Sequence, residues 1–227
     1  MGLFDFFKKR SRTGETTSEK QKAEVPKVLR MPGLTITTEP DEPAFLGYKT
    51  SWLAVKNSTP EEVMEKLQLG NVQVANWKSG LETRRFGKVF VSPVMDGYVI
   101  VSDMEELADD VERLRETAGL FDEMLFFATY RIVDLHTWAK FKKGETVRRY
   151  YFLGESGEVE SEGEMTPEER ELGFGSYLTS EEDDWETVEF ANEDSVMAIS
   201  KAWGIDPWFE SHKGERSTGF VAGYVRK

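Results

Sequence analysis

Several short stretches of the chain have the composition and spacing of β-strands, with β-branched and aromatic residues bounded by turn signals. These stretches lie at residues 48–56, 72–77, 88–92, 98–102, 124–153 and 219–225. A turn signal at Asp96-Gly97 separates two of them, and Lys142-Lys143-Gly144 breaks the longest into a hairpin. The pattern predicts a mainly antiparallel sheet.

Four other stretches carry helix signals. A Thr-Pro-Glu-Glu start opens two of them, because it combines a hydroxyl cap, a proline in the first turn and a glutamate that can close a capping box. Asp103 and Asn192 are the predicted caps of the other two. The predicted helices span residues 59–70, 103–119, 166–173 and 192–204. The predicted fold class is α+β, with three to four helices packed against mainly antiparallel sheet.

The expected organisation is a flexible N-terminal tail followed by a globular body. Residues 1–42 form the predicted tail and linker, because a polar run follows a short aromatic start. Residues 43–227 form the predicted single α+β domain, with possible halves at 43–119 and 120–227. The hydrophobic content of 39% is ample for a packed core.

Composition excludes several kinds of chemistry. The chain has no cysteine, which rules out disulfides, thiol nucleophiles, Cys-ligated zinc and iron–sulfur clusters. It has two histidines, too few for a His-rich metal site, and it lacks GxGxxG, P-loop and GxSxG motifs. No apolar run approaches the ~20 residues that span a bilayer. We therefore expect a cytoplasmic protein with no cofactor and no bound metal.

The acidic charge is concentrated in one segment. Residues 155–194 contain sixteen Asp or Glu and one base, Arg170, so their net charge is −15. The net charge of the whole chain is −13, so all other residues together sum to +2. Such a surface repels nucleic acid and attracts basic partners. The leading hypothesis is therefore a non-enzymatic binding protein, of the immunity or inhibitor kind, that recognises a basic protein.

The part of this segment that local structure does not explain is residues 180–194. The predicted contact residues are Glu181, Glu182, Asp183, Asp184, Trp185 and Glu186. Consecutive exposed carboxylates without the spacing of a calcium loop do not predict a metal site. Phe174, Tyr177 and Phe190 lie among the acids, and they are either contact residues for the partner or anchors that hold the segment to its own core.

The hairpin at residues 124–153 carries the alternative hypothesis, a hydrolase or lyase acting on a small anionic substrate. Strand alternation places Asp134, His136, Trp138 and Lys140 on one face. A two-residue turn would set Trp138 opposite Arg149 and His136 opposite Tyr151, whereas a three-residue turn would set them opposite Arg148 and Tyr150.

In either register an Asp-His-Tyr-Arg group, for which we take Asp134, His136, Arg149 and Tyr151, could perform acid/base chemistry. The competing interpretation is a half-buried sheet face stabilised by a cation–π pair. A buried His136 with both nitrogens hydrogen-bonded and no cleft beside it would exclude the enzyme.

The N-terminus presents Leu3, Phe4, Phe6 and Phe7 before a basic triplet. This is the composition of an interfacial membrane anchor, but it is short, and a tail that docks on the body or on a partner is the alternative. We do not expect membrane association.

Three motifs resemble a group of bacterial cytosolic proteins to which no activity is assigned. They are the His-x-Trp-Ala strand at His136, the return strand ending in Leu153-Gly154-Glu155, and Ala202-Trp203-Gly204-Ile205-Asp206-Pro207. The resemblance covers roughly residues 50–208. It implies a single fold and supplies no catalytic residue.

Overall fold

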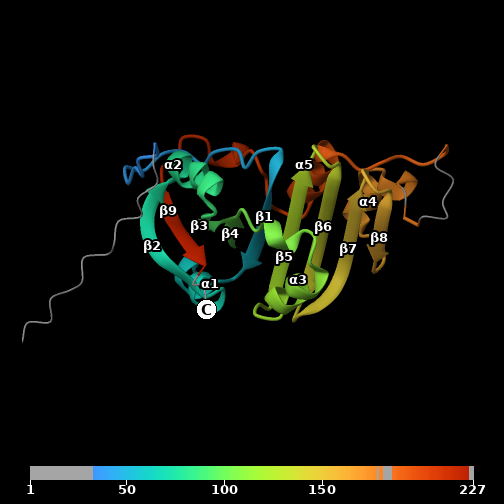
Figure 1. Cartoon of the computed structure of the whole chain (residues 1–227), viewed down its shortest axis with the longest axis horizontal. Coiled ribbons are helices and arrows are strands. Elements are labelled where there is room, and N and C mark those ends of the chain that lie inside the picture. The colour runs from blue at the N-terminus through green and yellow to red at the C-terminus, as the bar shows by residue number, and fades with distance from the viewer. Residues whose placement is uncertain (1–32, 178, 181–185, 225–227) are drawn as a thin grey trace, which may run out of the picture.

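The computed structural model describes residues 33–177, 179–180 and 186–224. The predicted N-terminal tail, apart from its last residues, lies outside this part of the chain, as do Leu3, Phe4, Phe6 and Phe7. Within it, nine strands form one antiparallel sheet in the order β2-β9-β3-β4-β1-β5-β6-β7-β8 (Figure 1). The strands are β1 (Lys49–Lys56), β2 (Leu69–Asn76), β3 (Val89–Met95), β4 (Tyr98–Ser102), β5 (Glu123–Tyr130), β6 (Leu135–Lys142), β7 (Glu145–Leu153), β8 (Glu158–Glu162) and β9 (Thr218–Tyr224).

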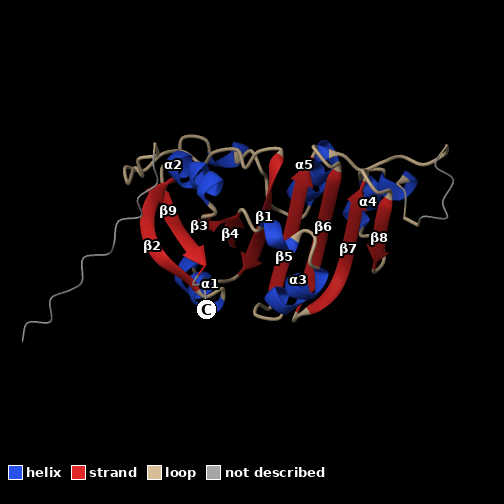
Figure 2. Ribbon diagram, in the orientation of Figure 1, coloured by secondary structure: helices blue, strands red, loops and turns tan. Residues whose placement is uncertain are grey.

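Short helices cover both faces of this sheet, so the predicted α+β class is confirmed. The α-helices of the described residues are α1 (Pro60–Lys66), α2 (Trp77–Leu81), α3 (Val111–Ala118), α4 (Pro167–Glu171) and α5 (Glu193–Ala202). The 3₁₀ turns are η1 (Glu82–Phe86), η2 (Glu105–Leu107), η3 (Phe174–Ser176) and η4 (Glu210–His212). Figure 2 shows α3 in front of the strands that α5 covers from behind.

The sheet has a hydrophobic cluster on each face because successive side chains of a strand point to opposite sides. Trp52, Phe127 and Trp138 belong to the cluster beneath α5. Leu53 and Phe126, each one residue away in sequence, belong to the cluster beneath α1 and α3. Both clusters contain residues from before and after position 120, and β1 pairs with β4 on one side and β5 on the other. One sheet therefore includes strands from both predicted halves.

Helix starts were predicted better than helix ends. Thr59, Thr166 and Asn192 cap α1, α4 and α5, and each closes a capping box. However, α1 ends at Lys66 rather than Gly70, because the chain enters edge strand β2 at Leu69.

The predicted cap at Asp103 is also wrong. Asp103 directly follows β4 and has the left-handed backbone conformation, at φ 61°, before η2 begins. The cap of α3 is Asp110, whose side chain accepts a hydrogen bond from the Arg113 backbone N–H. The apolar residues whose spacing predicted one helix therefore belong to two elements, the 3₁₀ turn η2 and the helix α3.

The packed body begins earlier than Pro43. Leu34 and Ile36 contact the cluster beneath α5. The Asp41 carboxylate accepts hydrogen bonds from the backbone N–H groups of Trp77 and Lys78, at 2.7 and 3.1 Å. It thereby satisfies two donors at the start of α2 that have no partner within the helix.

Among the described residues, no helix combines the length and apolar character needed to cross a lipid bilayer.

Candidate functional site

The β6–β7 hairpin has a register that differs from both predicted ones. The turn is Lys143-Gly144, so Lys142 pairs with Glu145 and Phe141 with Thr146. A β-bulge at Val147 then shifts the pairing by one residue, as bulges do. Beyond it, Trp138 faces Tyr150 and His136 faces Phe152.

The shift separates the predicted acid/base group. Tyr150 stacks on Trp138, with ring centroids 4.4 Å apart, so it shares the face of His136. Tyr151 packs in the cluster on the opposite face of the sheet, and Arg149 lies over its ring at 5.2 Å. The proposed set of Asp134, His136, Arg149 and Tyr151 is therefore divided between two faces, because a one-residue slip exchanges the faces of a strand.

His136 is enclosed. Its side chain is 0% exposed, Nδ1 lies 3.0 Å from Thr129 Oγ1, and Nε2 lies 2.9 Å from Asp134 Oδ1. Asp134 does orient the imidazole, as the sequence suggested, but from a turn residue at φ 55°. His136 lines none of the four hollows that we describe on the surface of the protein. Both ring nitrogens are hydrogen-bonded and the side chain is fully buried, so the imidazole is not open to solvent in this structure.

The other residues of this face form a buried polar network under α4. The Glu169 carboxylate accepts hydrogen bonds from Arg148 Nε, at 2.8 and 3.0 Å, and from Trp138 Nε1, at 2.8 Å. Glu169 is 0% exposed and Arg148 is 2% exposed. Glu169 therefore links Arg148 and Trp138 and docks α4 on the sheet. The face is held by this buried ion pair, and the cation–π contact of Arg148 is with Tyr150 rather than with Trp138.

Strands β7 and β8 and helix α4 lie at one end of the sheet (Figure 1). The exposed acids of residues 155–194 come from this part of the chain, and we call their surface the acidic end. Of the twelve Asp and Glu that the structure describes between residues 155 and 194, Glu169 is buried and eleven are at least partly exposed. They are Glu155, Glu158, Glu160, Glu162, Glu164, Glu168, Glu171, Glu186, Glu189, Glu193 and Asp194. A hydrogen bond from the backbone N–H of Glu168 lowers the pKa of its own carboxyl, which favours its charged form.

Two of these charges are neutralised within the protein. On the face of β8 that carries its glutamates, Glu160 pairs with Arg149, and Glu162 pairs with Arg115 of α3 at 2.6 Å. Apart from Glu186, the other acids of the acidic end form no ion pair within the described part of the chain, so this surface stays strongly negative.

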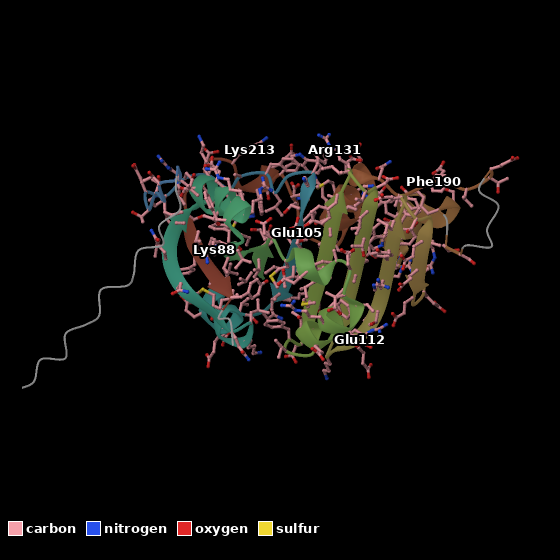
Figure 3. All side chains as sticks on the ribbon, viewed as in Figure 1. Lys88, Glu105, Glu112, Arg131, Phe190 and Lys213 are labelled. Carbon is pink, nitrogen blue, oxygen red and sulfur yellow. The ribbon has the colours of Figure 1, made fainter. Side chains whose placement is uncertain are left out.

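The aromatic residues among the acids divide into two kinds. Phe174 is 5% exposed and stacks on Tyr177, whose hydroxyl lies 2.7 Å from Ser195 Oγ. These two residues are therefore anchors to the core. Phe190 packs its ring against Phe152 and remains 36% exposed (Figure 3).

Leu172 follows α4 directly, is 39% exposed, and was not among the predicted contact residues. A leucine between a charged helix and Gly173 is the sequence signal that could have indicated an exposed apolar contact. Of the predicted contact residues, Glu186 is exposed, whereas Glu181, Glu182, Asp183, Asp184 and Trp185 lie outside the described residues.

Comparisons with known proteins add no relative. No protein-family model matches the chain, and no curated protein and no solved structure matches it either.

Proposed function

We propose that the protein is a non-enzymatic binding protein, of the immunity or inhibitor kind, whose acidic end recognises a basic protein partner. The observation that carries this proposal is that two exposed apolar side chains, Leu172 and Phe190, belong to the same segment as eleven exposed or partly exposed acids. Apolar contacts supply most of the affinity in protein interfaces, and a polar rim around them supplies selectivity.

Charge accounts for the choice of partner. A surface of one sign raises the association rate of an oppositely charged protein, and it does so less as salt screens the field. Like charges held close together also repel in the free protein, and a basic partner relieves this repulsion. The alternative hypothesis of a hydrolase or lyase gains no support, since His136, its proposed acid/base residue, is fully buried and hydrogen-bonded at both ring nitrogens. The cysteine-free composition favours a cytoplasmic encounter.

The experiment compares three forms of the protein as bait for cytosolic proteins, at low and at high salt. The test variant E168Q/E171Q/E186Q/E189Q neutralises four acids beside Leu172 and Phe190. The matched control, E61Q/E65Q/E112Q/E116Q, removes the same charge from exposed positions on α1 and α3. A specific basic partner should bind the wild type and the control, and its association with the test variant should slow and lose much of its salt dependence.

Two further variants refine the test. E181Q/E182Q/D183N/D184N examines the predicted contact residues that the structure does not describe. Leu172→Ser keeps the charge and should accelerate dissociation while it leaves the association rate unchanged. A partner that binds all of these variants with wild-type kinetics would contradict the proposal, and so would a partner of acidic character.

A further inference from the structure

The largest hollow described lies away from the acidic end, and five separate segments of the chain line it. They are the residues leading into β1, the turn η1, the β4–η2 connection, the turn after β5, and the end of β9 at Tyr224. Its volume is about 940 Å³. Two of its lining residues, Arg131 and Glu105, are labelled in Figure 3, where Glu105 lies below Arg131 in the view. A hollow of this size falls in the range of small-molecule sites, roughly 300–1,000 Å³.

Its lining contains a group of cations without ionic partners. Lys49, Arg84, Arg85 and Arg131 all line the hollow, and none of them forms an ion pair with another described residue. By contrast, the buried Arg148 forms an ion pair with Glu169 at 2.8 Å. Four neighbouring positive charges raise the local concentration of anions, because a concave wall focuses their field.

Two of these arginines are held in place while their charge stays available. Arg84 donates a hydrogen bond from Nη1 to the Leu46 carbonyl oxygen at 3.2 Å. Gly47 allows this approach, because a Cβ atom there would lie 3.3 Å from Arg84 Nη1. Arg85 lies over the ring of Phe86 at 5.1 Å. Neutral partners such as these orient a guanidinium without neutralising it.

Three acids, Asp103, Glu105 and Glu106, line the same hollow against four cations, so they compensate this charge only in part. Glu106 already pairs with Arg113 at 3.3 Å. Asp103 receives hydrogen bonds from Thr50 Oγ1 and Ser102 Oγ, at 3.5 and 3.2 Å, which hold its carboxyl on the wall. Burial raises the pKa of Asp103 to about 6 although Arg84 opposes the shift, so the group is partly protonated in weakly acidic solution.

Apolar surface lies beside the cations. Ile132 is 73% exposed and Tyr48 is 37% exposed, and both line the hollow. A second hollow of about 450 Å³ continues from the first and shares Lys49, Glu105 and Ile132 with it. An organic group attached to an anion could therefore rest on Ile132 and Tyr48 while the anion remains among the arginines.

We propose that this hollow is a binding site for a phosphomonoester, with Arg84, Arg85, Arg131 and Lys49 on the phosphate and Ile132 and Tyr48 on its organic group. Guanidinium groups match the geometry of a phosphate by donating paired hydrogen bonds, and several cations match its double charge. The site is independent of the acidic end.

Calorimetric titration of the full chain with phenyl phosphate tests this site. The test variant is R84Q/R131Q, and the matched control, R170Q/K213Q, removes two exposed cations that do not line the hollow. Circular dichroism confirms that each variant is folded. All four cations of the site are exposed, so Arg85→Gln serves as a milder second variant.

We expect phenyl phosphate to bind the wild type and the control equally, R84Q/R131Q to bind at least tenfold more weakly, and phenol to bind none of them. Inorganic phosphate distinguishes the two sources of the anion, because the proposed ester should bind more tightly than the free ion. The absence of saturable binding of phenyl phosphate, equal binding by R84Q/R131Q, or inorganic phosphate binding as tightly as the ester would overturn the proposal.

Discussion

Replacing Glu169 by glutamine should strongly destabilise the protein, although the two side chains have nearly the same shape. The change removes the negative charge that compensates Arg148 in the interior. If the amide oxygen replaces Oε1, it still accepts from Trp138 Nε1 and Arg148 Nε. The N–H₂ group then stands in place of Oε2, which accepts from Arg148 Nε and from the Thr166 backbone N–H. Removal of one member of a buried ion pair costs about 3–5 kcal/mol, because the other charge stays buried without its counterion.

The structure places the expected cost at the lower end of this range. Arg148 Nη1 keeps a hydrogen bond to Ser161 Oγ at 2.8 Å and longer ones, at 3.2–3.3 Å, to the carbonyl oxygens of residues 149, 162 and 163. These neutral acceptors partly solvate the guanidinium. We expect a loss of about 3 kcal/mol in the free energy of unfolding. For a chain of this length, the corresponding fall in Tm is roughly 6–12 °C.

Urea denaturation followed by tryptophan fluorescence and far-UV circular dichroism measures this cost. Glu168→Gln is the matched control, since Glu168 lies next to Glu169 on the same helix but is partly exposed, and it should cost less than about 1 kcal/mol. The double variant R148M/E169L should recover stability relative to Glu169→Gln, because it removes both charges. A Glu169→Gln protein within about 0.5 kcal/mol of the wild type would refute the reasoning.

Three further predictions concern single positions. Because burial raises the pKa of Asp103 from 3.8 to about 6, the folded state binds the proton more tightly, and this group should lower the free energy of unfolding by about 2 kcal/mol as pH rises from 4 to 7. Asp103→Asn should flatten that part of the pH profile in urea titrations, and an unchanged profile would contradict the shift. Gly80→Ala should cost roughly 1–3 kcal/mol, since the new Cβ would lie 2.2 Å from the Phe90 ring, whereas Gly175→Ala meets no atom within 4 Å and should be neutral in thermal denaturation. His136→Gln should cost roughly 1–3 kcal/mol through lost buried hydrogen bonds, and a variant with the wild-type urea midpoint would contradict the contribution of these bonds.

Local chemistry was readable in the sequence. The capping residues Thr59, Thr166 and Asn192 and the turn at Lys143-Gly144 act through hydrogen bonds between residues close in the chain, so a few letters are enough to predict them. Alternation of apolar residues likewise indicated the antiparallel sheet. The uneven charge was visible as a count, and the structure adds which acids reach solvent.

Partners distant in the chain decided the rest. The bulge at Val147 exchanges the faces of Arg148 and Arg149, and no local signal marks it. Glu169 has the sequence context of an ordinary capping-box glutamate, yet contacts 21 and 31 residues away place it in the core. β9 enters the sheet between β2 and β3.

The hollow lined by Arg84 and Arg131 illustrates the same limit, because its five segments are far apart in sequence and meet only in the folded chain. The sequence by itself therefore determined where helices and turns begin, what kind of fold they build, and which segment is acidic. Tertiary structure alone decided which side chains are enclosed and which face each other, since burial and pairing depend on long-range packing that no short window of the chain contains.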